Sequence, residues 1–198
     1  MRAYTFDVRE ALLRSAKAEF LQCGFEKASL RTICKNAGVT TGAFYAYFEK
    51  KDDLFAAIVD PVLEKFDENC QFILEKQRQK RYTTGDSELC SVEFLAAHRE
   101  EAILLLDCAA GTKYENFQKE VLAAFMQESY QIQMDFHAEK PVDPNLVRIL
   151  LRMKLEAYRQ ILYGGYDRQE VRKLVRYLTS FTQAGVIQLM QELQANQE

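Results

Sequence analysis

Small, hydroxyl-bearing and aromatic side chains gather in one short stretch of the chain, SLRTICKNAGVTTGAFYAYF, which runs from Ser29 to Phe48. Ser29 is a good helix N-cap, and Gly38 allows a tight reversal between two short helices. The second of these helices is predicted to begin near Thr40, and Phe44 and Phe48, four residues apart, anchor it on a core. This order of elements is a helix-turn-helix pattern.

The second helix of this pattern keeps one face away from the core. Its residues there are small or can form hydrogen bonds, and such residues let a helix approach the base edges of a DNA major groove closely. They are Thr41, Gly42, Ala43, Tyr45, Ala46 and Tyr47. Helical geometry predicts that Tyr45 and Tyr47 are exposed, because Phe44 and Phe48 already occupy the core-facing positions.

The distribution of charge changes what the composition indicates. The 198 residues carry 26 Lys and Arg against 29 Asp and Glu, and this net charge of −3 alone argues against a nucleic-acid partner. Residues 1–51, however, hold nine basic and five acidic residues, a net charge of +4, which leaves −7 on the rest. Such asymmetry is expected where one end of a protein meets a polyanion, although an ordinary solvated helix face gives the same pattern.

At these residues the sequence resembles the N-terminal domain of the TetR family of transcriptional regulators. The resemblance lies in the apolar first helix, in LRTICKNAGVTTGAFYAYF and in KKDDLFAAIV, which opens the fourth helix. It is close over about the first 60 residues, whereas the remainder agrees in length, helix count and two long terminal helices. The resemblance implies a sequence-specific repressor whose DNA affinity is changed by a small molecule bound in the C-terminal domain.

The resemblance also implies roles for individual residues. Thr41, Gly42, Ala43 and Ala46 are expected to face base edges, and Arg31 to reach toward the groove. Phosphate contacts are expected from Tyr45, Tyr47 and Lys51. The whole predicted DNA-binding set is Arg31, Thr40, Thr41, Gly42, Ala43, Tyr45, Ala46, Tyr47, Lys50 and Lys51. Many family members have Ser or Thr at the N-cap where this chain has Lys50, so we expect a poorer cap there.

The rest of the chain is also predicted to be helical, because apolar residues recur at spacings of three and four between few prolines and glycines. Asp143 with Pro144 predicts one helix start, and Asp167 with Glu170 predicts a capping box at another. We therefore expect an all-α fold with a three-helix DNA-binding domain, residues 1–51, and a larger helical effector-binding and dimerisation domain, residues 52–198. One continuous helix is expected over about residues 116–137.

A single groove-reading helix makes few contacts, so such modules usually bind a palindromic operator on double-stranded DNA as dimers. The last two helices resemble the family's dimer interface, although burial within one chain would explain their apolar stripes equally well. Bulky, adaptable side chains in the middle helices predict an effector cavity or simply a core. The predicted pocket residues are Phe66, Phe94, Phe117, Met126, Tyr130, Met134 and Tyr158.

Other function classes find little support in the sequence. No metal motif, cofactor-binding loop or nucleophile motif stands out, which argues against an enzyme, and no apolar run is long enough to span a membrane. We expect a cytoplasmic protein with reduced cysteines. One alternative stays open, a thiol-based regulator that senses oxidants or metals and uses the same DNA-binding head. Cys90, Cys108 and His98 are its most plausible cluster.

Overall fold

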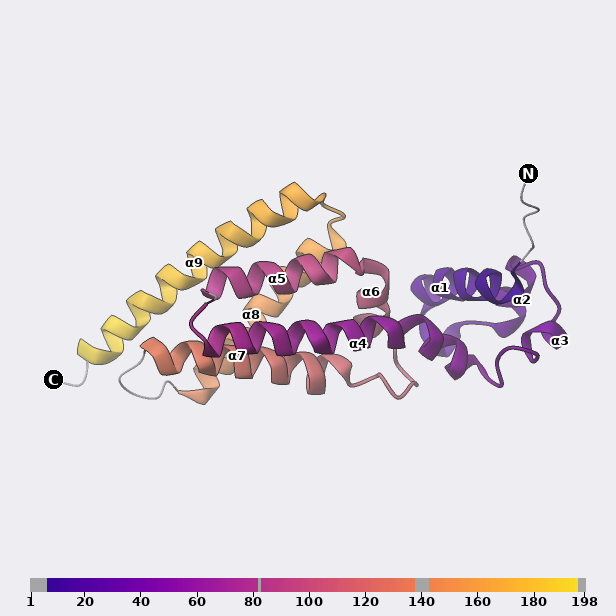
Figure 1. The fold of residues 1–198 in the computed structure, drawn as a ribbon, viewed down its shortest axis with the longest axis horizontal. Helices are drawn as coiled ribbons and strands as arrows, with labels where there is room; N and C mark the ends of the chain where they lie inside the picture. Colours follow the sequence, from indigo (N-terminus) through magenta and orange to yellow (C-terminus); the bar gives the residue numbers. More distant parts are fainter. Residues whose placement is uncertain (1–6, 82, 138–142, 196–198) are drawn as a thin grey trace. The chain divides into compact units, whose positions relative to one another are not determined.

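The computed structural model describes residues 7–81, 83–137 and 143–195, and this part of the chain is helical without any strand (Figure 1). The elements are, in order, α1 (Val8–Lys27), α2 (Leu30–Asn36), α3 (Thr41–Phe44), α4 (Lys51–Arg78), α5 (Thr84–Ala97), α6 (Arg99–Asp107), the π-helical η1 (Phe117–Leu122), α7 (Ala123–His137), α8 (Pro144–Tyr163) and α9 (Arg168–Ala195). The predicted all-α fold class is confirmed.

Two predicted helix starts are also confirmed by their hydrogen bonds. The Asp143 carboxylate accepts a hydrogen bond from the Asn145 amide over 2.8 Å, with Pro144 as the first helical residue. Ahead of α9, the Asp167 amide donates to the Glu170 carboxylate (3.1 Å) and the Glu170 amide donates to the Asp167 carboxylate (2.9 Å). This reciprocal pair is the predicted capping box.

One other boundary differs from the prediction. The stretch expected as one helix over residues 116–137 begins with the π-helical turns of η1, and the α-helix starts only at Ala123. At this junction one carbonyl, that of Asn116, accepts hydrogen bonds from the amides of both Lys119 and Glu120. Helix α5 begins at Thr84, where Thr83 and Asp86 cap it by exchanging backbone and side-chain hydrogen bonds.

The chain forms two compact units, and α4 continues from the first into the second. The first unit comprises residues 1–65 and 98–120, and its core is aromatic. The rings of Phe20, Phe25 and Phe55 lie 5.2–5.7 Å apart, which is ordinary spacing for packed aromatic pairs. The predicted boundary at residue 51 concerns function and stays a prediction.

Polar contacts hold α1 against its neighbours in this first unit. The Ser15 hydroxyl donates to the Ile33 carbonyl of α2 over 2.8 Å. On α6, Glu100 and Glu101 both pair with Lys17, at 3.0 and 2.7 Å. These contacts tie both the helix-turn-helix segment and α6 to α1.

The second unit comprises residues 66–97 and 121–198. Its core cluster joins Val92 of α5, Ile161 of α8, and Val171 and Val175 of α9. Helix α9 packs along α5, and α7 packs on α8 (Figure 1). The Gln77 side-chain amide of α4 donates to the Ser129 hydroxyl of α7 over 2.9 Å, so the second half of α4 is bound to α7.

Candidate nucleic-acid interface and effector region

The turn between α2 and α3 is built by local hydrogen bonds. Ser29 caps α2 by accepting from the Thr32 amide (3.4 Å), and the Val39 amide donates to the Cys34 carbonyl over 3.0 Å. Gly38 has φ +71°, a left-handed conformation that glycine adopts without a steric penalty. The sequence prediction of a reversal at this glycine is confirmed.

Helix α3 is only four residues long and depends on its cap and its anchor. The Thr40 hydroxyl accepts a hydrogen bond from the Ala43 amide over 3.1 Å. Phe44 is fully buried and stacks on Phe48, whose exposed fraction is 7%, with their ring centroids 5.7 Å apart. The turn after α3 is therefore fixed to the core of the first unit, although the α-helix itself ends at Phe44.

The opposite face of α3 and its following turn lies open. Tyr45 is 62% exposed and Tyr47 is 50% exposed, as the sequence predicts. Ala43 is half-buried. The remaining predicted contacts apart from Lys51 are all exposed: Arg31, Thr40, Thr41, Gly42, Ala46 and Lys50. Apart from Ala43 and Lys51, the predicted contact residues are therefore all exposed to solvent.

Lys51 has a different position from the one its predicted role requires. Its ammonium group donates hydrogen bonds to the carbonyl oxygens of Phe25 (2.5 Å) and Ala28 (3.0 Å) and lies 4.3 Å from the centroid of the Phe25 ring. These carbonyls lie at the C-terminal end of α1, so Lys51 binds protein groups where the sequence predicted a phosphate. Its neighbour Lys50 is exposed.

The start of α4 is capped from within the helix, because Lys50 has no side-chain oxygen to offer. The Asp53 carboxylate accepts a hydrogen bond from the Lys50 amide over 3.1 Å. Asp52 and Asp53 also place negative charge in the first turn, where it opposes the positive end of the helix dipole. The expected weakness of the cap is thereby offset by a residue three positions later.

Comparison with known proteins bears directly on this surface. Residues 12–58, which contain α2, the turn and α3, match the family model described as bacterial regulatory proteins, tetR family. The N-terminal region of the chain is therefore similar to bacterial regulators of the tetR family. The predicted family resemblance is confirmed.

Individual TetR-family relatives agree most strongly in the same region. The HTH-type transcriptional repressor BepR of Brucella suis biovar 1 (strain 1330) is 41% identical over 58 residues, which span 29% of this chain and 28% of BepR. The HTH-type transcriptional regulator YhgD of Bacillus subtilis (strain 168) is 20% identical over 153 residues, 74% of this chain and 80% of YhgD.

The fold likeness to solved TetR-family structures extends over most of the chain. A transcriptional regulator of the TerR/AcrR family from Aquifex aeolicus VF5 superposes with a TM-score of 0.59 at 20% identity. The superposition covers 89% of this chain and 99% of the other. This likeness shows that the helical C-terminal part shares the fold.

The predicted effector residues lie in different parts of the fold. Met126, Tyr130 and Tyr158 line hollows in the second unit. Phe66 packs on Phe94, with ring centroids 6.0 Å apart, and lines neither hollow. Phe117 is buried in the first unit, and the side chain of Met134 lies outside the described residues.

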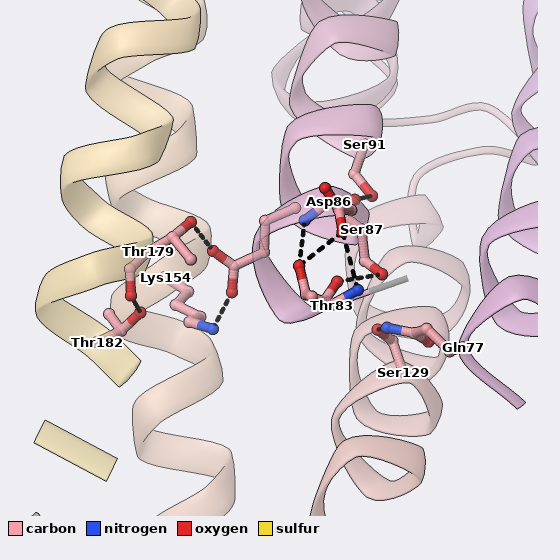
Figure 2. A network of polar contacts seen from close by, with 10 residues as sticks. Gln77, Thr83, Asp86, Ser87, Ser91, Ser129, Lys154, Thr179 and Thr182 are labelled. Atoms are coloured by element: carbon pink, nitrogen blue, oxygen red, sulfur yellow. Dashed lines mark hydrogen bonds and ion pairs between the residues drawn. The ribbon is translucent and has the colours of Figure 1, made fainter. Parts of the chain in front are cut away.

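Sequence reasoning missed a polar cluster beside these hollows. Glu88 of α5 accepts from the ammonium group of Lys154 on α8 and from the hydroxyl of Thr179 on α9. The Glu88 and Lys154 side chains are only 10% and 15% exposed. Figure 2 shows Lys154 and Thr179 together, and Gln77 beside Ser129. The available signal was a charged residue, Lys154, inside the apolar stripe of a predicted helix.

The thiols offer little support for a redox or metal site. Burial raises the pKa of Cys34, Cys70, Cys90 and Cys108, whereas reactive thiols need a lowered pKa. Cys90 belongs to the second compact unit, while Cys108 and His98 belong to the first. Within the described residues no group of three His, Cys, Asp or Glu side chains could hold a metal ion.

None of the described helices is long and apolar enough to cross a membrane.

Proposed function

We propose that the protein is a sequence-specific DNA-binding regulator that represses transcription. The observation that carries the proposal is the exposed face of α3 and its following turn, held by buried Phe44 and Phe48 within the region that matches the TetR family. Thr41, Gly42, Ala43 and Ala46 would approach base edges, and Arg31 would reach into the groove beside them. Repression is proposed because BepR, a relative, is named as a repressor.

Phosphate contacts in this proposal come from Tyr45, Tyr47 and Lys50, which are all exposed. A tyrosine hydroxyl is a neutral donor on a rigid stem, and Lys50 adds charge. Thr40 contributes by fixing the first turn of α3. Lys51 contributes indirectly, by holding the start of α4 in place, since its ammonium group already binds the carbonyls of Phe25 and Ala28.

The proposed assembly is a homodimer on a palindromic operator, formed through α8 and α9. Both helices expose large apolar side chains at intervals of about one turn: Ile149 and Met153 on α8, and Tyr177 and Phe181 on α9. Phe181 is 74% exposed, more than any other large hydrophobic residue described. Covering these side chains with a second copy would remove apolar surface from water, which favours association.

The proposed regulation is a change in DNA affinity caused by a small molecule bound in the second unit. The hollows lined by Met126, Tyr130 and Tyr158 are suited to such an effector. A cytoplasmic location follows from the proposed DNA partner.

A binding titration tests the proposed DNA contact with a variant that should keep the fold. Gly42 lies in the first turn of α3, and a Cβ there would meet only the Thr40 hydroxyl oxygen at 3.7 Å. Gly42→Glu should therefore fold normally, since a carboxylate is favourable near a helix N-terminus, but its charge would oppose DNA. We expect at least about a 100-fold loss of affinity for the protein's own upstream DNA, a large electrostatic effect.

The control is Ala123→Glu, which makes the same charge change at an exposed position on α7. It should leave DNA affinity unchanged. Equal affinity of the Gly42→Glu variant and the unmodified protein, or equal binding of upstream and scrambled DNA, would contradict the proposed function.

A further inference from the structure

Helix α3 and the turn that follows it contain none of the side chains that usually distinguish bases by paired hydrogen bonds. From Gly38 to Phe48 the sequence has no Arg, Lys, Asn, Gln, Asp or Glu. Bidentate contacts to guanine and adenine, and acceptance of a hydrogen bond from the cytosine amino group, need those side chains. Recognition by α3 is therefore limited to methyl groups, hydroxyl groups and close approach of the backbone.

The internal structure of the protein does not require glycine at position 42. Gly42 lies within α3 and lacks the positive φ that Gly38 adopts, so a side chain would cause no backbone strain there. A Cβ at this position would meet only the Thr40 hydroxyl oxygen, at an ordinary contact distance of 3.7 Å. Glycine is also less favourable than alanine in a helix. Its presence leaves open space on an exposed part of α3.

Exposed residues that carry methyl groups lie on either side of Gly42. Thr41 precedes it, and Ala46 follows four residues later. The Phe48 amide donates to the Phe44 carbonyl over 3.0 Å, so the helical turn continues past Ala46. Residues four apart in such a turn are neighbours on its surface. The open space at Gly42 therefore has an apolar border.

We propose that α3 selects thymine by its 5-methyl group, with Gly42 leaving space for one such methyl and with Thr41 and Ala46 packing against thymine methyls beside it. Thymine is the base that carries a methyl group in the major groove, and alanine and threonine methyls are its usual apolar contacts. This inference rests on the proposed function and names the bases that α3 would read. Arg31, on α2, supplies the bidentate chemistry that a guanine elsewhere in the half-site would need.

Exchange of thymine for deoxyuridine tests this contact directly, because the two bases differ only by the methyl group. The probe is the protein's own upstream DNA, amplified once with dTTP and once with dUTP, and titrated with the full-length protein in a retardation assay. Scrambled DNA of the same composition gives the nonspecific affinity. We expect the deoxyuridine probe to bind at least about tenfold more weakly, since each buried methyl contributes about fourfold and a site offers several.

Gly42→Ala tests which residue accommodates the methyl. The variant should be at least as stable as the unmodified protein, but its added methyl group would occupy the space of the thymine methyl. We expect a loss of affinity of at least about tenfold on the thymine probe, as for an overpacked contact, and of less than about threefold on the deoxyuridine probe. An equal loss on both probes would overturn the role assigned to Gly42.

Thr41→Ser removes one methyl group and keeps the hydroxyl. It should reduce the preference for the thymine probe over the deoxyuridine probe by about three- to fivefold. The matched control is Thr83→Ser, which makes the same change at the exposed residue that caps α5. This control should preserve the preference.

The outcomes separate this inference from the proposed function. Equal and sequence-selective binding of the two probes would overturn the contact with thymine methyl groups and leave the proposed function in place. If the deoxyuridine probe bound more weakly by the same factor in Gly42→Ala and Thr41→Ser as in the unmodified protein, the effect would come from DNA shape, and the inference would again be overturned. If neither probe bound selectively, the proposed function would be contradicted, and this inference with it.

Discussion

The ammonium group of Lys51, at the first residue of α4, lies 3.0 Å from the carbonyl oxygen of Ala28, the residue that follows α1. Helices α2 and α3 lie in the chain between these two residues. The contact therefore closes a loop of sequence around the proposed DNA-reading segment. A lysine that binds carbonyls at a helix end stabilises that end, and here it also fixes where α4 begins.

This contact predicts different effects for two neighbouring lysines. Lys51→Met should lower the free energy of unfolding by about 1–2 kcal/mol, because buried carbonyls lose a charged hydrogen-bond donor. Lys50→Met should leave stability unchanged, since Lys50 is exposed, but should reduce the slope of log affinity against log salt by about one. Chemical denaturation and DNA binding at several salt concentrations measure both. If Lys51→Met reduced the salt slope and left the stability unchanged, this would contradict the structural role of Lys51 at the Phe25 and Ala28 carbonyls.

The dimer proposal predicts that a charge on α9 separates the two copies. Phe181→Glu should shift the protein from dimer to monomer in light scattering and weaken operator binding by at least about tenfold, as half-sites are no longer bound together. The matched control, Phe72→Glu, changes a 44% exposed aromatic residue on α4 and should leave the dimer intact. A monomeric unmodified protein, or a dimeric Phe181→Glu variant, would argue against this interface.

The contact between α5 and α9 predicts a pH dependence of stability. The hydrogen bond from Arg172 lowers the pKa of Glu93 from its ordinary value of 4.5, and Arg168 adds to the effect. Glu93 therefore stabilises the fold above about pH 4.5, and this contribution is lost as the pH falls through its lowered pKa. The stability difference between the unmodified protein and Glu93→Gln should be full at pH 7 and disappear in acid. Glu68→Gln, at an exposed position, should show no such difference.

Thiol reactivity separates the effector-responsive regulator from the thiol-based alternative. Burial, with the charge of Asp67 and the neighbouring Cys90, raises the pKa of Cys70 to about 12, so little thiolate exists at pH 8. Iodoacetamide should modify Cys70 at least about 100-fold more slowly in the folded protein than in denaturant, as followed by peptide mass spectrometry. Rapid modification of folded Cys70, accompanied by a change in DNA affinity, would favour the thiol-based alternative.

Local signals explain why much of the fold was predictable from sequence. Caps such as Ser29 and Asp167 and the turn glycine Gly38 act through bonds to residues only a few positions away, so the sequence contains both partners. The exposure of Tyr45 and Tyr47 followed from the buried pair Phe44 and Phe48 in the same way.

Features that depend on distant partners were not predictable from spacing. Lys51 binds carbonyls 23 and 26 residues earlier in the chain, and Glu88 meets Lys154 and Thr179 from two other helices. No periodic pattern connects such residues. The predicted pocket set failed to come together for the same reason, since Phe117 and Tyr158 share an apolar character but belong to different compact units.

The central claim is that two copies of the α3 surface read a symmetric DNA sequence. Selection of bound fragments from random DNA by the purified full-length protein tests this most directly. The account predicts enrichment of one inverted repeat, whose half-site spacing reports the separation of the two recognition surfaces, and loss of enrichment with Gly42→Glu but not with Ala123→Glu. Recovery of no common sequence, or of a single site without symmetry, would contradict it.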